Sequence, residues 1–294
     1  MLKQSLQMSL AFLLLAASAQ LSSAQLELIR GEDRATNVEA AKLIGEGDAF
    51  QQADDHQKAQ AAFDAAVRLR RALLERYPAV SEFQWGLAVA ITRRAILNLE
   101  FDNNEAADGQ LIEAVGLLRT ALDASSPTDR LVRDYRQSFD IARSYRARIL
   151  AQRGDEAGAF ALYEAILESQ LELLDAEPEN ARRPANLAIT LYQMGELKMA
   201  EEAFELSHTL FSRANTYFEL AVEMSAATGD AGMSTRAGAG YFMAGQISWK
   251  LGRGDRAWTE FERALEHFTV ALAARPEDPL ANDLQQRTNA WLGR

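Results

Sequence analysis

The sequence predicts an all-α fold in which antiparallel helix pairs repeat along the chain. Three observations support this prediction: apolar residues recur at helical spacing, one spacing pattern returns about every fifty residues, and helix-breaking residues separate the copies. The pattern is a small residue, a second small residue 12 positions later, a large apolar residue 4 positions after that, and a small or aliphatic residue 3 positions further on. The five copies are Gly47/Ala59/Phe63/Ala66, Ala95/Ala107/Leu111/Ala114, Ala147/Ala159/Tyr163/Ile166, Gly195/Ser207/Phe211/Ala214 and Gly245/Ala257/Phe261/Ala264.

The first residues of these copies lie 48, 52, 48 and 50 residues apart, a period that indicates an array of repeats. In such an array each unit packs on its sequence neighbours. Proline cannot continue a helix, and in four copies a proline follows the large apolar residue by 15 or 16 positions. These prolines are Pro78, Pro127, Pro178 and Pro276. We therefore expect helix pairs at about 37–78, 81–126, 128–178, 180–229 and 230–276.

Turn signals separate the two helices of the second, third and fifth pairs, at 102–104, 154–155 and 252–255. The fourth pair has no glycine or proline between Gly195 and Phe211, so its turn has no signal in the sequence. After the last pair, residues 279–294 have the pattern of an amphipathic helix. We expect this helix to cap the end of the array, because a terminal repeat otherwise leaves an apolar face exposed.

Residues 1–24 have the features of a secretory signal peptide: Lys3 near the start, an apolar run over 10–17, and small residues before Ala19 and Ala24. The run is too short to span a bilayer, which takes ~20 residues. The alternatives are an uncleaved anchor or a buried amphipathic helix. We expect cleavage after Ala19 or Ala24, a short lead-in at 25–36, and a periplasmic or secreted protein that does not insert in the membrane once the signal is removed.

The composition narrows the classes of partner. The 294 residues include 42 acidic and 31 basic side chains, a formal net charge of −11, which repels phosphate backbones and anionic lipid surfaces. We therefore expect no nucleic-acid partner. Cysteine is absent from the sequence, which excludes disulfides, thiolate metal sites, a cysteine nucleophile and a lipoprotein anchor.

The last copy resembles the tetratricopeptide repeat (TPR) family. The matching residues are Tyr241, Ala244, Gly245, Gly252, Ala257, Phe261 and Ala264. The resemblance covers about residues 37–279 and departs in length, since the usual unit has roughly 34 residues. It implies a right-handed superhelical solenoid whose first helices line a concave groove for peptides or protein segments, and it implies no catalysis. The family's clamp for a terminal carboxylate uses Lys and Asn. The matching Lys positions are Ile44, Thr92, Ser144, Tyr192 and Phe242 here, so the clamp is not implied.

Catalytic and cofactor signals are missing from the sequence. His56, His208 and His267 fall in three different repeats, without the spacing of a two-histidine metal site, and we expect them at the surface. The glycines around Gly238 and Gly245 do not match a dinucleotide-binding loop and suit close helix packing better. The sequence thus predicts a non-enzymatic protein without a metal or cofactor.

Large or polar residues at groove positions of the first helices are the candidates for partner binding. They are Arg148, Tyr192, Met199, Phe242, Gln246 and Trp249. Arg148 belongs to a stretch, 130–153, with seven arginines and two acids, and the following helix at 155–180 has eight acids and no base. Two alternatives stay open. These helices could neutralise each other through surface ion pairs, or some arginines could face the groove and bind a partner's carboxylates.

We therefore expect an exported scaffold that binds another protein or an extended peptide in its concave groove, in the bacterial cell envelope. The alternative is a periplasmic sensor or carrier module that binds a small ligand, which would require a closed and convergent pocket. Self-association through an end helix is also open.

Overall fold

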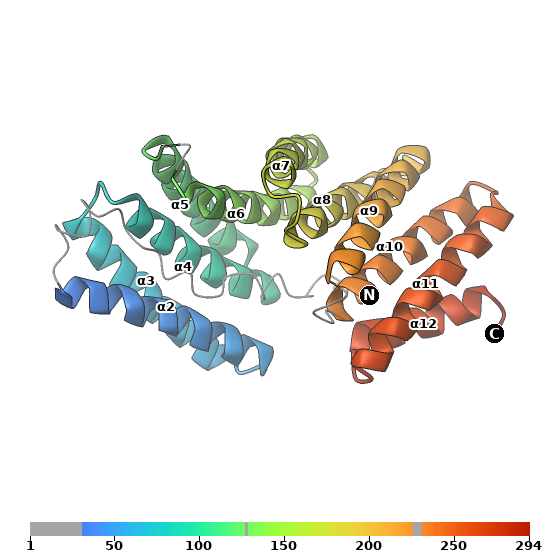
Figure 1. The fold of residues 1–294 in the computed structure, drawn as a ribbon, viewed down its shortest axis with the longest axis horizontal. Coiled ribbons are helices and arrows are strands. Elements are labelled where there is room, and N and C mark those ends of the chain that lie inside the picture. The colour runs from blue at the N-terminus through green and yellow to red at the C-terminus, as the bar shows by residue number, and fades with distance from the viewer. Residues whose placement is uncertain (1–30, 127–128, 226–230) are drawn as a thin grey trace. The chain divides into compact units, whose positions relative to one another are not determined.

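A computed structural model describes residues 31–126, 129–225 and 231–294 (Figure 1). Over these ranges the chain forms eleven α-helices and no β-strand, which confirms the predicted all-α class. The chain divides into two compact units between Arg153 and Gly154, inside the predicted third helix pair. We describe each unit by itself. The predicted signal peptide at 1–24, Pro127 and the predicted end of the fourth pair at 229 lie outside the described residues.

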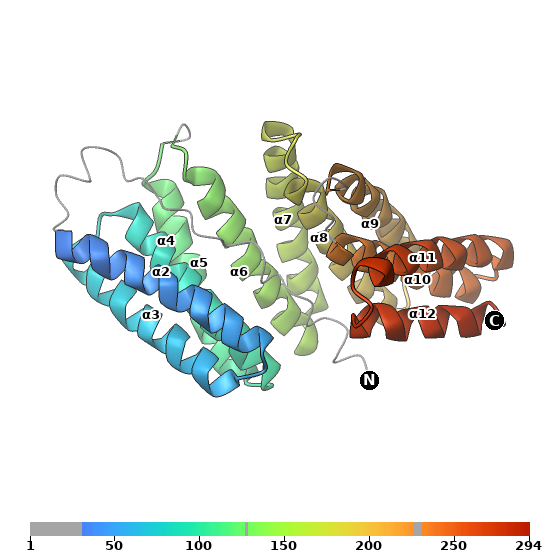
Figure 2. The same ribbon diagram turned by 60° about the horizontal axis from the view of Figure 1, so that its bottom comes forward.

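The N-terminal unit contains α2 (Gly31–Gln52), α3 (His56–Arg76), α4 (Ser81–Glu100), α5 (Asn104–Asp123) and α6 (Val132–Gln152). Helices α2 and α3 form one antiparallel pair, and α4 and α5 form the next (Figures 1 and 2). Helix α4 packs on α3 behind it and on α5 ahead of it, and it also contacts α2 and α6. Each helix is therefore packed mainly against its sequence neighbours, as an array of pairs requires.

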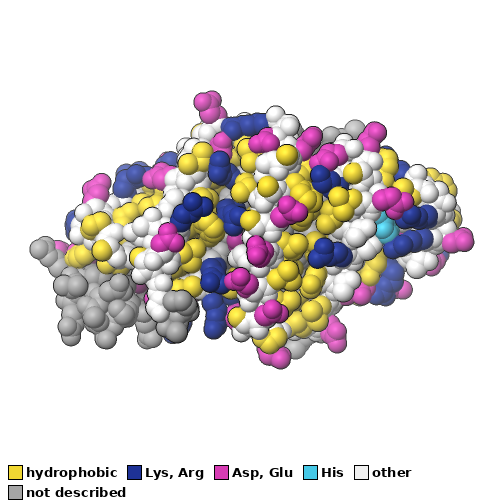
Figure 3. All heavy atoms as spheres, turned by 90° about the horizontal axis from the view of Figure 1, so that it is seen from above, with side chains coloured by type: hydrophobic (Ala, Val, Ile, Leu, Met, Phe, Trp, Pro, Cys, Tyr) yellow, Lys and Arg dark blue, Asp and Glu magenta, His cyan; other side chains and the backbone are white. Residues whose placement is uncertain are grey.

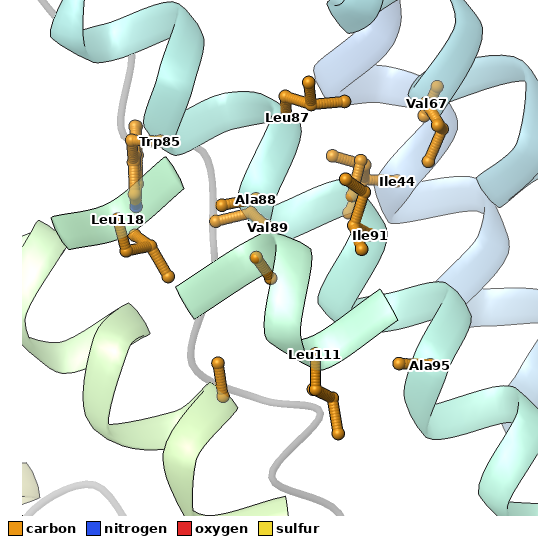
Figure 4. Packing of buried hydrophobic residues seen from close by; sticks show 14 of the residues in the cluster. Ile44, Val67, Trp85, Leu87, Ala88, Val89, Ile91, Ala95, Leu111 and Leu118 are labelled. Atoms are coloured by element: carbon orange, nitrogen blue, oxygen red, sulfur yellow. The ribbon is translucent and has the colours of Figure 1, made fainter. Parts of the chain in front are cut away.

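Helix α4 is the centre of this unit, because it is buried along most of its length. Leu87, Val89 and Ile91 of α4 lie in one apolar cluster with Ile44 of α2 and Leu111 of α5 (Figure 4). Apolar residues lie on most sides of α4, which agrees with its burial, but the buried positions also include Glu82, Gln84, Thr92 and Arg93.

The C-terminal unit contains α7 (Glu156–Ala176), α8 (Arg182–Ala200), α9 (Phe204–Ser225), α10 (Ala231–Lys250), α11 (Gly254–Ala274) and α12 (Pro279–Trp291). Helices α8 and α9 form a pair, as do α10 and α11 (Figures 1 and 2). Helix α7 packs on α8, and α9 packs on α10. Helix α12 folds back on both α10 and α11, where Ala281, Leu284 and Leu292 join their apolar core.

The large apolar residue of every repeat copy is buried, as the spacing predicts. These residues are Phe63, Leu111, Tyr163, Phe211 and Phe261. Where the copy begins with glycine, the aromatic ring occupies the space of the missing side chain. A Cβ placed on Gly47 would overlap the ring of Phe63, and one on Gly245 would lie 2.7 Å from a ring atom of Phe261. The glycine therefore lets the two helices of a pair approach closely.

The turn after the first helix of each repeat copy contains a residue with a positive φ angle. A residue with positive φ follows the first residue of each copy by seven positions. These residues and angles are Asp54 (56°), Asp102 (56°), Gly154 (82°), Glu202 (58°) and Gly252 (73°). The fourth turn, which has no sequence signal, is thus Glu201–Ala203 and places a glutamate where two other turns have glycine.

Residues 31–36, which we expected to belong to a lead-in at 25–36, are part of α2. The reason is tertiary: the carboxylate of Asp33 is buried and accepts a hydrogen bond from the hydroxyl of Tyr77 at 2.8 Å. It also pairs with Arg76. These partners at the end of α3 hold the first turn of α2 in place, and its own sequence gives no sign of them.

Candidate functional site

Five of the six residues predicted to bind a partner lie on two helices of the C-terminal unit. Tyr192 and Met199 are on α8, and Phe242, Gln246 and Trp249 are on α10. These two first helices belong to the same unit and contact each other. Arg148 lies on α6 of the N-terminal unit and is treated separately.

Trp249 is the most exposed of the five, with 51 % of its surface accessible. Its indole meets that of Trp291 edge to face, with ring centroids 5.7 Å apart. Trp291 is itself 40 % exposed and stacks on Phe261 at 5.4 Å. Two indoles from α10 and α12 thus stand at the surface on a rigid aromatic base. Rigid, half-exposed aromatic side chains are the residues that protein interfaces use as anchors.

Phe242 does not belong to this surface, which corrects the prediction. Only 1 % of it is exposed, because its ring packs on Phe261 at 5.9 Å and the guanidinium of Arg287 lies 5.0 Å above it. Arg287 comes from α12. The helix expected to cap the end of the array therefore covers a residue expected to line the groove.

Tyr192, Met199 and Gln246 are partly buried and offer only part of each side chain. Tyr192 meets Phe211 edge to face at 5.1 Å. Burial raises the pKa of Tyr192 well above its usual value, and the nearby carboxylate of Glu196 adds to this, so the phenol stays neutral. Met199 packs in the same apolar cluster as Phe211. We define the α8/α10 surface as Tyr192, Met199, Gln246 and Trp249, with Trp291 beside it.

Arg148 lies at the C-terminal end of α6, where its guanidinium sits 5.2 Å from the ring centroid of Tyr145. Its Nε is buried and makes no hydrogen bond within the described ranges. Arg148 is also close enough to Glu100 to lower the pKa of that carboxyl, although burial raises it more and the net change is upward. The prediction that Arg148 binds a partner stays a prediction.

Other arginines of the stretch 130–153 have a partner that neither alternative included. Arg146 Nε lies 3.3 Å and Arg153 Nη1 2.5 Å from the two oxygens of Asp108 on α5. Arg143 lies 3.7 Å from Asp140 on its own helix. The excess positive charge of α6 is thus partly balanced inside the N-terminal unit, by the preceding helix.

His208 is buried, with 4 % of its surface exposed, although we expected it at the surface. Its Nε2 lies 2.9 Å from Oε1 of Glu260, whose other oxygen accepts a hydrogen bond from Ser248 at 2.6 Å. Arg256 Nε also donates to Glu260, at 3.1 Å. Burial alone would raise the pKa of Glu260, but the hydrogen bonds from His208 and Ser248 hold it below its usual value. The network ties α9, α10 and α11 together.

This network contains groups that could act as an acid or a base, but a substrate cannot reach them. Ser212 Oγ lies 3.5 Å from Nδ1 of His208, so Ser212, His208 and Glu260 form a line. A general base must come within hydrogen-bond reach of its substrate, and a buried ring gives a substrate no approach. We assign the network to packing. A signal was present in the sequence, since His208 precedes Phe211 by three positions and so shares its buried helix face.

Two other features are absent from the described residues. No group of three or more His, Cys, Asp or Glu side chains there could hold a metal ion. Over the same ranges, no helix is both long and apolar enough to cross a membrane. On the face in Figure 3, acidic and basic side chains are interspersed among hydrophobic ones and do not form a patch of one sign.

No family model and no curated protein matches this sequence. Solved structures do match. The Rap conjugation gene regulator of plasmid pLS20, in complex with the Phr* peptide, is 13 % identical over 94 % of this chain and 69 % of its own, with a TM-score of 0.50. BtubC (BKLC) from P. vanneervenii is 17 % identical over 81 % and 92 %, with a TM-score of 0.49. YrrB, described as a TPR protein with an unusual peptide-binding site, is 12 % identical over 90 % and 98 %, with a TM-score of 0.36. At these identities the likeness shows the fold alone, an all-α arrangement of helix pairs whose structural neighbours include TPR proteins.

Proposed function

We propose that this protein is an exported, non-enzymatic scaffold that binds a protein or peptide partner at the α8/α10 surface. The observation that carries the proposal is the exposed indole of Trp249, held against Trp291 on a base of buried aromatic rings. A side chain that is apolar, rigid and exposed loses little conformational entropy when a partner covers it. The solved neighbour with a bound Phr* peptide has the same type of fold, which agrees with peptide binding.

The surface suits a partner segment with an apolar side chain at its centre. Trp249 and Trp291 offer ring faces and edges, Met199 offers an adaptable thioether, and the amide of Gln246 offers both a donor and an acceptor. Lys250, next to Trp249 in the sequence, carries a positive charge and lies 4.8 Å from the ring centroid of Phe204. We expect an aromatic or aliphatic anchor on the partner, with polar groups around it.

A photo-crosslinking amino acid at position 249 tests the proposal in the cell envelope. Trp258 is the matched control site, because it is a second exposed tryptophan of the same unit, with 43 % of its surface accessible, on α11. We expect one specific crosslinked protein or peptide from position 249 and not from position 258. With the partner identified, Trp249→Ala should weaken binding by about 2 kcal/mol or more, the loss typical of an aromatic hot spot. Equal crosslinking from both positions would contradict the proposal.

Export rests on the sequence of residues 1–24, and it has its own test. We expect the mature protein in the periplasmic or secreted fraction, with an N-terminus at Gln20 or Gln25. Replacing Leu13, Leu14 and Leu15 by glutamine should keep the protein in the cytoplasm, because a signal needs its apolar run. Intact mass and fractionation measure both results. A full-length protein in the cytoplasm of wild-type cells would contradict this part.

A further inference from the structure

A shallow depression lies between α4 and α6 of the N-terminal unit. Val89, Thr92 and Arg93 of α4 line one side, and Ser138 and Ile141 of α6 line the other. Val89 and Ile141 make it partly apolar, and the remaining three side chains are polar. It is separate from the α8/α10 surface, which belongs to the other unit.

Arg93 is the unusual residue of this depression, because it is charged and only 5 % exposed. Its Nε lies 3.2 Å from Oδ1 of Asp48, on α2. However, neither Nε nor Nη2 of Arg93 nor Oδ1 of Asp48 makes a hydrogen bond to any residue that the structure describes. The two groups balance each other's charge without the alignment of a hydrogen bond. A buried donor without an acceptor destabilises a protein, so the site favours any acceptor that fits better.

The hydroxyl groups of Thr92 and Ser138 differ in whether they can donate a hydrogen bond to such an acceptor. The hydroxyl of Thr92 donates to the carbonyl oxygen of Ala88 at 2.8 Å, so its proton is already used. Ser138 is different, since its oxygen accepts a hydrogen bond from Nε1 of Trp85 at 2.9 Å and its own proton is free to turn toward the depression. Arg93 and Ser138 thus present donors from two helices, beside the apolar side chains of Val89 and Ile141.

We propose that Arg93 binds a carboxylate carried on an apolar stem, as on a glutamate side chain or a peptide end, and that Asp48 occupies Arg93 until this carboxylate displaces it. A guanidinium fork binds a carboxylate with two parallel hydrogen bonds, an arrangement that Asp48 does not achieve. Burial raises the pKa of Asp48 above its ordinary value despite the nearby Arg93, which means that burial destabilises the charged carboxylate. The incoming carboxylate exchanges a poorly aligned ion pair for an aligned one. Arg93 is one position after Thr92, so this is not the lysine clamp of the TPR family.

Nuclear magnetic resonance of the full chain can test this site without knowledge of the partner. The reporters are the Nε–H of Arg93 and the indole N–H of Trp85, which is bonded to Ser138. We expect sodium butyrate to shift both signals to saturation and butyramide, which has the same stem without the charge, to leave them unchanged. Equal responses to the two compounds would overturn the proposal.

Three variants give the result its specificity. Arg93→Lys keeps the charge and the pair with Asp48 but loses the fork, and we expect binding about tenfold weaker, the loss of one charge-assisted hydrogen bond. Asp48→Asn removes the competing carboxylate, so this variant should bind butyrate more tightly than wild type.

Arg94→Gln is the matched control, because Arg94 is the adjacent arginine, pairs with Asp64 at 3.1 Å and is outside the depression. Weaker binding by Asp48→Asn, or an unchanged Arg93→Lys, would overturn the proposal. Circular dichroism shows whether each variant is folded.

The source of the carboxylate is resolved with two blocked amino acids. N-acetylglutamic acid α-amide carries only a side-chain carboxylate, and N-acetylleucine carries only a terminal one. A preference for the first assigns a glutamate side chain, a preference for the second assigns a peptide end, and no response to either would contradict the proposal. The peptide reading deepens the proposed scaffold function and rests on it. Butyrate binding and crosslinking at Trp249 are separate measurements in separate units, so the failure of one is distinguishable from the failure of the other.

Discussion

Phe63 in the first helix pair and Phe261 in the last lie in equivalent places, each against a glycine of the preceding helix. What surrounds the two rings is different. Around the first pair, α2 is attached to its neighbours by polar side chains: Asn37 donates to Glu82 at 3.1 Å, and Gln51 donates to Glu100 at 2.5 Å. Around the last pair, aromatic rings continue outward from Phe261 through Trp291 to Trp249.

Particular buried polar groups also differ, although each region has buried atoms without a hydrogen bond, such as Nε2 of His267 on α11. Near α2, the unpaired buried atoms include Nε of Arg70, Oε2 of Glu82, and the Arg93 and Asp48 atoms already described. In the last pair, Glu260 collects hydrogen bonds from His208, Ser248 and Arg256. The repeat pattern therefore fixes one contact, the glycine and the ring, and leaves its surroundings free to differ.

The strongest way to test this comparison is to remove the shared contact. Phe63→Ala and Phe261→Ala should each lower the free energy of unfolding by about 3–5 kcal/mol, because each leaves a cavity in a packed core. We expect the larger loss for Phe261, which also supports Phe242 and Trp291. Chemical denaturation measures both, with Val270→Ala as an exposed control expected to change the free energy by no more than about 0.5 kcal/mol. A larger loss for Phe63→Ala would contradict the comparison.

Neutralising one buried carboxylate in each region should give unequal results. Glu260→Gln loses hydrogen bonds to a charged acceptor, so unfolding should become easier by about 1–3 kcal/mol. Asp48 is poorly aligned with Arg93, and burial raises its pKa, so Asp48→Asn should destabilise the protein less than Glu260→Gln does at neutral pH. Thermal unfolding of the two variants under the same conditions gives the answer. Similar losses in both would show that the two environments do not differ.

A change of pH extends this contrast to whole regions. Burial raises the pKa values of Asp48, Glu82 and Glu100, so the stability these groups contribute is present at low pH and is lost as pH rises through the raised values. Burial acts the same way on Glu219 and Glu260, but their hydrogen bonds hold the pKa values below the usual value, so their contribution is lost as pH falls through them.

Between pH 7 and pH 4 we therefore expect hydrogen exchange, corrected for its intrinsic pH dependence, to show α9–α11 losing protection relative to α2–α4. An equal response of both regions would count against the assignment of these carboxylates.

The smallest effect is expected at the fourth turn. Glu202 has a φ of 58°, where two other turns have glycine, so Glu202→Gly removes steric strain and should stabilise the protein by about 0.5–1 kcal/mol. Glu201→Gly is the control, since Glu201 has a φ of −76° and gains nothing from glycine. Denaturation midpoints of the two variants decide the matter. Equal shifts in both would mean that the conformation at Glu202 carries no strain.

The sequence predicts the elements whose cause is local. Repeat spacing places Phe63 and its equivalents, since helical periodicity alone decides which residues share a face. Features that depend on contacts between residues far apart in the sequence could not be predicted. Phe242 has the spacing of a groove residue, and only the return of α12 covers it with Arg287. Likewise, residues 31–36 are helical where we expected a lead-in, because Asp33 meets Tyr77, which is far along the chain.

The structure differs from the sequence prediction in two further places, the turn at Glu202 and the ion pairs of α6, where the energies involved are small. The left-handed conformation of Glu202 costs an L-residue only about 1–2 kcal/mol, which the packing of two helices exceeds, so no glycine was required to mark the turn. The arginines of α6 were expected to pair forward in the chain or to face a partner, and Asp108 accepts two of them from the preceding helix. Charge patterns along a sequence do not identify which neighbouring helix supplies the counter-ion.

The constant position of the left-handed residue, seven after the start of every copy, has a consequence for how this protein could change. Every turn places its positive-φ residue at the same position of its copy, so a segment cut at two such turns and exchanged for another would keep this position constant. We therefore expect these turns to be the best borders for chimeras that exchange one repeat for another.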